Sequence, residues 1–75
     1  MRFSFMPSSV IRRFTYDPSQ RELTIEFVTG RIYVYYDVPE WEAEAFRSAQ
    51  SKGRYFNFHI RDNYAFREVT KEHAG

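Results

Sequence analysis

The chain has 75 residues, so it forms one domain that buries only about 60% of the surface exposed by its unfolded form. It contains no cysteine, which excludes disulfides and thiolate zinc sites, and eight Phe, six Tyr and one Trp supply the bulk of the core. The formal net charge of +1 gives no reason to expect a polyanion partner, and no apolar run reaches the ~20 residues of a membrane span or forms a signal peptide, so we expect a soluble, cytoplasmic protein.

The first part of the chain predicts an antiparallel hairpin. In a first strand over residues 10–16, the three-residue spacing of Ile11 and Phe14 indicates either a bulge or one exposed side chain. The run Asp17-Pro18-Ser19-Gln20 has the composition of a turn. A second strand over residues 22–28 alternates cleanly. Its residues on one face are Leu23, Ile25 and Phe27.

The loop after the second strand decides which face of the sheet the tyrosines of the third strand occupy. A two-residue turn would force a positive φ on the β-branched Thr29, so a three-residue loop with Gly30 in the left-handed region is favoured. That register places Tyr33 and Tyr35 on the face of Leu23, in the core. The shorter loop would turn both rings to the opposite face, where they could stack on nucleobases.

A helix is predicted to begin near Pro39 and to end at Gly53. Asp37 and Glu40 are expected to form a capping pair at its start. The expected apolar stripe consists of Val38, Trp41, Ala45 and Ala49, widened by Phe46. Because Trp41 lies in this stripe, we expect its truncation to alanine to cost about 3–5 kcal/mol.

The rest of the chain predicts a short helix and at most one more strand. Phe56 and Ile60 are four residues apart, which favours a helix over residues 55–60, and residues 64–69 alternate weakly. We therefore expect an α+β fold: a three-stranded antiparallel meander, one helix on its Leu23 face, a short second helix and that final strand. The ordered core of this single domain would span about residues 8–69, with a tail at 70–75. The residues expected to complete the core are Trp41, Phe46, Phe56, Ile60 and Tyr64.

Three motifs together resemble a known family. They are Leu23-x-Ile25-x-Phe27-x-x-Gly30, Tyr33-x-Tyr35-x-Asp37-Val38-Pro39 and Ala49-x-Ser51-x-Gly53-x-x-Phe56-Asn57-x-x-Ile60-Arg61-x-x-Tyr64. In this order, preceded by Ser8-Ser9, Ile11 and Tyr16-Asp17, they resemble the KTSC domain, which occurs as stand-alone bacterial proteins and at the C-terminus of some lysyl-tRNA synthetases. The attachment to a synthetase implies RNA binding by analogy of neighbourhood alone.

Basic residues in the second half of the chain are candidates for phosphate contact. Aromatic residues and His59 are interleaved with them, a mixture that single-stranded nucleic-acid sites use. The alternative is an ordinary solvated charged face. The candidates for binding RNA, such as tRNA, are Lys52, Arg54, Tyr55, Arg61 and Arg67.

A second candidate surface is the other face of the third strand, where Ile32, Val34 and Tyr36 lie. The resemblance leads us to expect polar residues there instead of Ile32 and Val34. If these side chains are exposed, they form an apolar patch that fits a protein partner or a second copy of the chain in a homodimer. The alternative is that the arginines of the first strand, with Phe3 and Phe5, cover them.

The residues do not predict an enzyme. His59 and His73 are the only histidines, no thiol is present, and Ser8 and Ser9 have no base nearby in the sequence. We therefore expect no catalytic residue, no metal and no small-molecule cofactor, and no phosphate-cradling glycine loop. The sequence thus predicts a small non-catalytic binding module, for RNA or alternatively for protein.

Overall fold

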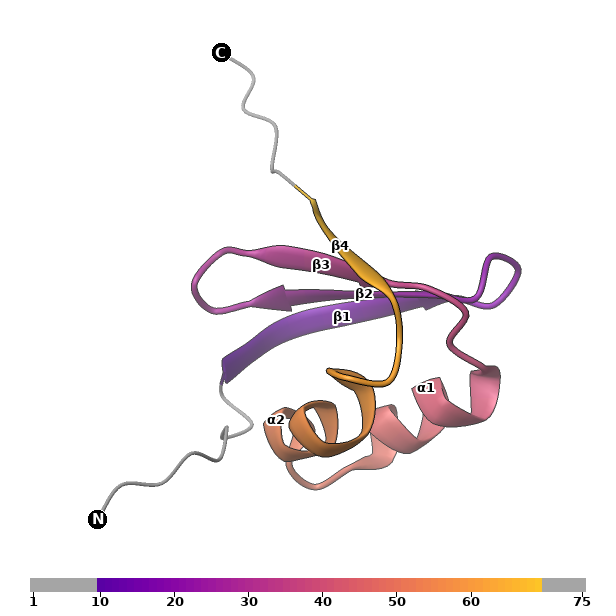
Figure 1. Ribbon diagram of the computed structural model, residues 1–75. Helices are drawn as coiled ribbons and strands as arrows, with labels where there is room; N and C mark the ends of the chain where they lie inside the picture. Colours follow the sequence, from indigo (N-terminus) through magenta and orange to yellow (C-terminus); the bar gives the residue numbers. More distant parts are fainter. Residues whose placement is uncertain (1–9, 70–75) are drawn as a thin grey trace.

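A four-stranded antiparallel sheet lies over a layer of helices (Figure 1) in the computed structural model, which describes residues 10–69. The strands are β1 (Ile11–Asp17), β2 (Glu22–Phe27), β3 (Ile32–Tyr35) and β4 (Phe66–Val69), in that spatial order. The helices are α1 (Glu40–Ser48), α2 (Lys52–Tyr55) and the π-helical turn η2 (Phe56–Ile60). The predicted α+β class is confirmed, and the final strand forms. The predictions for Phe3, Phe5, Ser8, Ser9, His73 and the tail at 70–75 lie outside the described residues.

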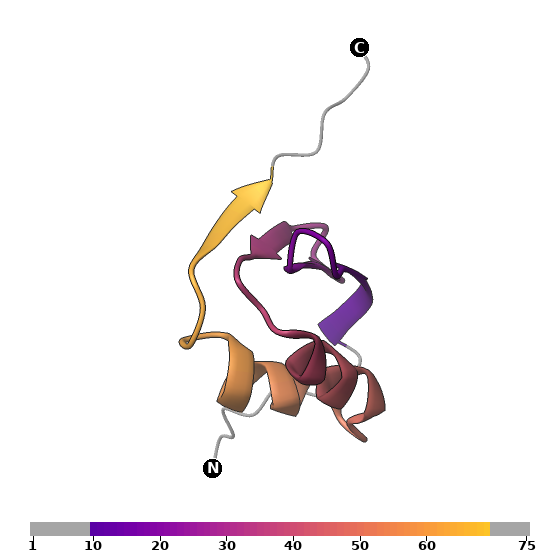
Figure 2. The ribbon, with the colours of Figure 1, turned by 90° about the vertical axis from the view of Figure 1, so that its right-hand side faces the viewer.

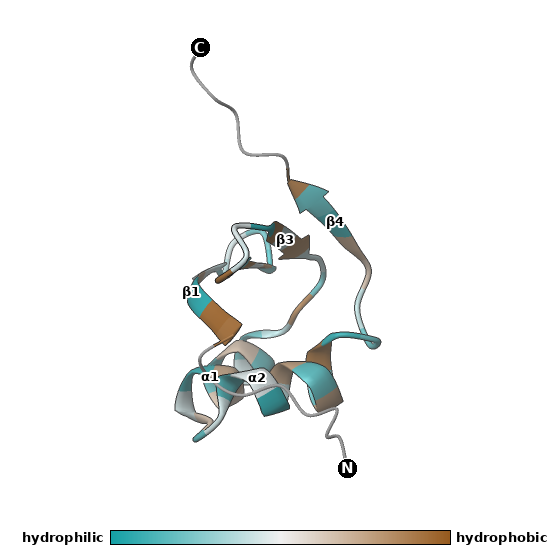
Figure 3. Cartoon of the chain, turned by 90° about the vertical axis from the view of Figure 1, so that its left-hand side faces the viewer, coloured by the Kyte–Doolittle hydropathy of each residue, from teal (hydrophilic) through white to brown (hydrophobic). Residues whose placement is uncertain are grey.

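The helices cover one face of the sheet and leave the other face open to view (Figure 2). We call the covered face the inner face and the opposite one the outer face. Figure 3 shows that the middle of β4 is hydrophilic. β4 is an edge strand of the sheet, and charged residues in its middle are typical of such a position.

The hairpin of β1 and β2 contains the bulge that the spacing of Ile11 and Phe14 allowed. The pairing shifts between Ile11 and Arg13, so that Phe14 pairs with Ile25 and both can belong to the core. In the turn, Asp17 Oδ1 accepts hydrogen bonds from the Ser19 backbone N–H at 3.0 Å and from its hydroxyl at 2.9 Å.

The register of β2 and β3 is the predicted one. Gly30 has a φ of +96°, and its N–H donates to the carbonyl of Phe27 at 2.8 Å. Ile25 pairs with Tyr33, and Leu23 is the partner of Tyr35. The tyrosines therefore lie on the inner face, where Tyr35 is only 3% exposed. A side chain at position 30 would disfavour this positive φ, which glycine adopts without steric cost.

Both ends of the first helix differ from the prediction. No side chain within residues 10–69 caps α1, so the expected pair of Asp37 and Glu40 does not form; instead Asp37 takes a φ of 59° where the chain leaves the sheet. The helix ends at Ser48, and Gly53 is a buried residue inside α2 rather than a helix stop. The physical reason is Ser51, whose hydroxyl accepts a hydrogen bond from the Arg54 N–H at 3.3 Å and so starts a second helix.

Most of the residues predicted to complete the core do so, but the prediction for Trp41 is wrong. Phe46, Phe56 and Ile60 are buried, and Tyr64 packs against the core half-buried. Trp41 is 67% exposed, because α1 turns the face with Glu42, Ala43 and Phe46 inward. At about 100° per residue, Trp41 lies about 200° around the helix from Ala43 and about 140° from Phe46, so burying those two residues directs Trp41 to solvent. The sequence predicts a large loss of stability on truncating Trp41 to alanine, and the exposed position of Trp41 does not support that prediction.

Candidate functional site

The inner face of the sheet is not fully covered at its β4 side. A hollow with a volume of about 300 Å³ opens there between the ends of β3 and β4 and the η2 turn. We call it the aromatic hollow. Its lining residues are Phe27, Tyr33, Tyr35, Phe56, Arg61, Asp62 and Phe66.

Cross-strand packing builds the walls of the aromatic hollow. Tyr35 pairs with Phe66 across β3 and β4, and their ring centroids are 5.4 Å apart. The ring centroid of Tyr33 lies 5.5 Å from that of Phe66, and the ring of Phe56 stands edge-on to Tyr35 at 5.5 Å. Phe66 is nevertheless 52% exposed. The hollow thus offers aromatic surface that the fold itself leaves in contact with solvent.

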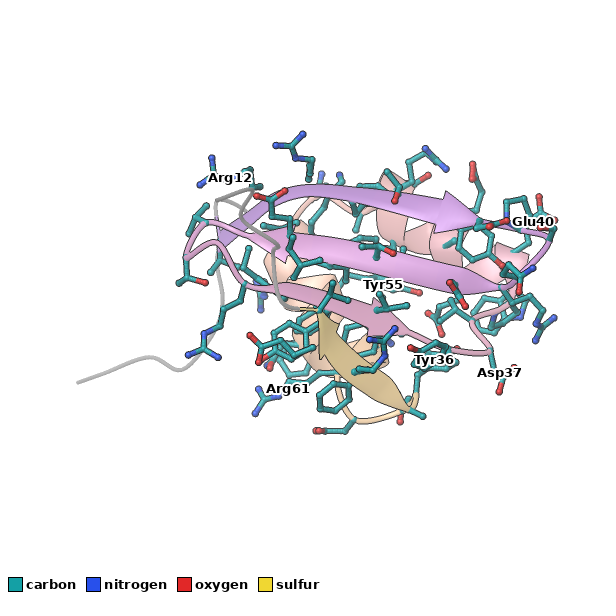
Figure 4. The ribbon with its side chains drawn as sticks, turned by 90° about the horizontal axis from the view of Figure 1, so that it is seen from above. Arg12, Tyr36, Asp37, Glu40, Tyr55 and Arg61 are labelled. Carbon is teal, nitrogen blue, oxygen red and sulfur yellow. The ribbon has the colours of Figure 1, made fainter. Side chains whose placement is uncertain are left out.

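A pair of opposite charges stands at the rim of the hollow. The π-helical turn, in which the Arg61 N–H donates to the Phe56 carbonyl at 2.9 Å, delivers Arg61 and Asp62 to this position. The Arg61 guanidinium also donates to Asn57 Oδ1 at 2.5 Å. Arg61 lies beside β4 at the edge of the sheet (Figure 4).

The pKa of the Tyr35 hydroxyl reflects burial and the charges around the aromatic hollow. The pKa of this hydroxyl is raised to about 12, mainly by burial; Tyr33 and Asp62 also raise the pKa, and Arg61 lowers it. Both charged rim residues therefore lie close enough to act on a phenol at the base of the hollow. The arrangement can hold a flat ring against aromatic walls while polar groups contact its edge.

A second aromatic cluster is closed instead of open, and we call it the Glu42 junction. The Glu42 side chain is the buried charged group of the described core, at 5% exposure. The Tyr64 hydroxyl donates to Glu42 Oε1 at 2.6 Å, and the Tyr55 hydroxyl donates to Oε2. The junction therefore ties α1, α2 and the segment before β4 together through satisfied polar atoms.

The junction changes the interpretation of Tyr55, a predicted RNA contact. Burial, followed by the hydrogen bond to Glu42, raises the pKa of its hydroxyl to about 12, and burial likewise raises the pKa of Tyr64. The Tyr55 ring packs against His59, with centroids 4.4 Å apart. Its polar end is therefore committed to the interior.

The predicted basic residues do not form one site. Lys52 is half-buried, and its ammonium donates to the Ala49 carbonyl at 3.3 Å. Arg54 is exposed and lines a separate, shallow hollow of about 280 Å³ with Phe58 and His59. Arg61 is the member of the predicted set that lines the aromatic hollow.

Arg67 and the predicted apolar patch occupy the outer face. Arg67 Nε donates to the Tyr36 hydroxyl at 3.0 Å, and Arg67 pairs with Val34 across the strands. Val34 is 9% exposed, and Ile32 and Tyr36 are half-buried. No helix among the described residues lies over this face (Figure 4), yet these three side chains do not form an open apolar patch.

Sequence reasoning missed Phe66 and Asp62. The sequence predicts residues 64–69 only as a weakly alternating segment, and the pairing of Phe66 with Tyr35 is what brings it to the other aromatic rings. Asp62 appeared in the sequence as an isolated acid among arginines. The available signal was an aromatic residue directly before Arg67 in a short edge strand.

A membrane-spanning helix and a metal-binding cluster are both absent from the part of the chain that the structure describes. None of the helices within residues 10–69 combines the length and the hydrophobicity needed to cross a bilayer. The same residues contain no group of three or more histidine, aspartate or glutamate side chains that could hold a metal ion.

Comparisons with known proteins agree on one family. A family model described as the KTSC domain matches residues 7–64. The crystal structure of a KTSC domain protein from Yersinia pestis aligns with a TM-score of 0.79 and 38% identity, over 89% of this chain and 94% of that chain. A lysine–tRNA ligase from Nostoc punctiforme is 39% identical over 62 residues, and an uncharacterized protein from Stutzerimonas stutzeri is 42% identical over 52 residues. The match to the ligase covers 83% of this chain and 11% of the ligase. The match to the Stutzerimonas protein covers 69% of this chain and 73% of that protein.

Proposed function

The chain belongs to the KTSC domain family, and from that premise and the geometry of the aromatic hollow we propose that it is a small, non-catalytic domain that binds single-stranded RNA in the bacterial cytoplasm. The observation that carries the proposal is the half-exposed Phe66 beside Tyr33, with Arg61 at the rim. The matching segment in relatives named lysine–tRNA ligase supports an RNA setting, with tRNA as the first candidate partner.

The chemistry of the hollow suits an unpaired base. An aromatic side chain stacks on the face of any base, and each stacked base contributes about 1–3 kcal/mol to binding. In a duplex these faces are already stacked, so an open aromatic wall favours single strands, loops and ends. Arg61 provides a charge that can contact the neighbouring phosphate.

The proposal is tested by fluorescence anisotropy with a labelled single-stranded RNA and with bulk tRNA as competitor. Phe66→Ala should weaken binding about tenfold, since it removes one stacking surface. Phe58→Ala is the matched control, because Phe58 is also exposed, at 62%, but lines the separate hollow with Arg54. Equal affinity of Phe66→Ala and the parent would overturn the proposal.

Charge reversal at the rim provides an independent test. Arg61→Glu should weaken binding and should lower the slope of log affinity against log salt by about one phosphate contact. Arg67→Glu, on the outer face, is the control and should change both quantities less. If the two variants behave alike, RNA does not contact the aromatic hollow through Arg61.

The alternative of protein binding through Ile32, Val34 and Tyr36 has less support, since Val34 is already buried and its neighbours are half-buried. Salt-independent self-association that is lost on Val34→Lys would favour it over RNA binding.

A further inference from the structure

We propose that Asp62 makes the aromatic hollow select guanine over the other bases, a specificity that rests on the RNA-binding function proposed above.

The first observation is that two acidic residues beside aromatic rings differ in whether their carboxylates accept hydrogen bonds within the fold. Glu42 is buried and accepts both tyrosine hydroxyls of its junction. Asp62 is exposed, lines the aromatic hollow and makes no hydrogen bond or ion pair with another residue of the described range 10–69. Its carboxylate is therefore an acceptor at the rim that the fold does not use.

The second observation is that Asp62 and Arg61 present opposite hydrogen-bonding characters side by side. An ionised carboxylate only accepts hydrogen bonds, and a guanidinium only donates them. Both residues follow the η2 turn directly and line the same hollow. A base held against Phe66 and Tyr33 would find both an acceptor and a donor among the residues that line the hollow.

Guanine fits this pair better than the other bases. Its Watson–Crick edge presents two adjacent donors, the N1–H and the 2-amino group, which a carboxylate accepts as a bidentate pair. The neighbouring O6 is an acceptor that suits a guanidinium. Adenine and cytosine each offer one amino group at this edge, and uracil offers one imino N–H. Asp62 therefore gains its second hydrogen bond from guanine alone.

A quaternary ammonium is the competing ligand, because aromatic rings with a carboxylate also attract such cations. The guanidinium of Arg61 stands at the same rim and repels a second positive charge. The pairing of Asp62 with Arg61 thus favours a neutral base with both donors and acceptors.

The test uses uridine oligonucleotides that carry a single central guanosine, inosine or adenosine. Inosine differs from guanosine only by the missing 2-amino group, so the parent should bind guanosine about tenfold more tightly than inosine. Asp62→Asn keeps the size of the side chain but brings its own N–H donors, and it should abolish that preference. Its affinity for the adenosine oligonucleotide should not fall, because a carboxamide can donate to adenine N1 and accept from the adenine amino group. Since Asp62 is exposed, the variant should melt like the parent.

The outcomes separate the two proposals. If the parent binds all three oligonucleotides equally and Phe66→Ala weakens each, the guanine preference is wrong and RNA binding stands. A guanosine preference that survives in Asp62→Asn likewise contradicts the role of Asp62. If no oligonucleotide binds, whether or not tetramethylammonium does, both proposals are wrong.

Discussion

The Glu42 junction and the aromatic hollow contain the same kinds of residues but treat them in opposite ways. In the junction, Tyr55 and Tyr64 donate their hydroxyls to one buried carboxylate. In the hollow, Phe66 remains half-exposed and Asp62 faces solvent. The difference shows that aromatic residues beside an acid become part of the core where the fold satisfies the polar atoms around them, and stay open to solvent where it does not.

The position of α1 explains the difference. Phe46 of α1 packs on Phe14 of β1, with ring centroids 4.7 Å apart, and Arg47 stands over the Phe14 ring. The helix therefore covers the β1 side of the inner face, and its Glu42 faces inward. β4 lies at the other edge of the sheet, where the η2 turn and the rim residues approach it. The uncovered side becomes the hollow.

The largest effect is expected from Glu42→Ala. It leaves two phenol hydroxyls without their acceptor, and each unsatisfied hydroxyl costs about 1–3 kcal/mol, so the free energy of unfolding should fall by about 2–6 kcal/mol. The melting temperature should drop by roughly 10 °C or more. Glu44→Ala is the control, because Glu44 is exposed and only pairs with Arg47. A melt of Glu42→Ala within about 2 °C of the parent would show that the junction is not structural.

The second-largest effect is expected from alkaline pH, which should weaken the Glu42 junction and lower stability. Burial and the bond to Glu42 raise the pKa of Tyr55 from 10.0 to about 12. A raised pKa means that the folded state holds the proton more tightly, so the contribution to stability is complete below pH 10 and is lost as the pH rises to about 12. Urea unfolding across this range should show the loss. Tyr55→Phe cannot ionise and should lose less stability over the same range; equal losses would contradict the assignment.

A smaller effect on stability is expected in the hollow. Phe66 is 52% exposed, so Phe66→Ala should lower the free energy of unfolding by only about 1–2 kcal/mol, including its ring contacts. The tenfold loss of RNA affinity expected for the same variant corresponds to about 1.4 kcal/mol, which is of similar size. A loss of stability as great as that of Glu42→Ala, measured by urea unfolding, would mean that the hollow is core and would end the contrast between the two regions.

The smallest effect is expected from Trp41→Ala. Trp41 is 67% exposed, and surface substitutions usually change stability by about 0.5 kcal/mol or less. Phe46→Ala, from the buried face of the same helix, should cost about 3–5 kcal/mol and is the comparison variant. Thermal melts of both decide the matter: a loss for Trp41→Ala that equals the loss for Phe46→Ala would mean that α1 is rotated differently.

Local patterns predicted the sheet well and the helices less well. The positive φ of Gly30 set the register of β2 and β3, because the alternation of side chains leaves no intermediate arrangement. The bulge in β1 was one of two alternatives, and the pairing with β2 selected it. On α1, by contrast, the apolar residues Trp41, Ala45 and Phe46 defined a stripe that was broad enough to allow two rotations.

The candidate site was predicted only at Arg61. Its partners come from three other segments, and their meeting depends on the pairing of Tyr35 with Phe66 and on the π-helical turn. Lys52, Arg54 and Arg67 are near Arg61 in the sequence, but they lie on α2 and on the outer face. Proximity along the chain therefore did not identify which cations share a surface.

The amino-acid sequence by itself determined the strands, the tyrosine pair on the inner face and the family, since these follow from local alternation, one glycine and a spaced motif. The tertiary structure alone decided that Glu42 is buried in place of Trp41 and that Phe66, Arg61 and Asp62 surround one hollow. The physical reason is that a buried carboxylate requires partners, and here the two phenols that supply them come from distant segments of the chain.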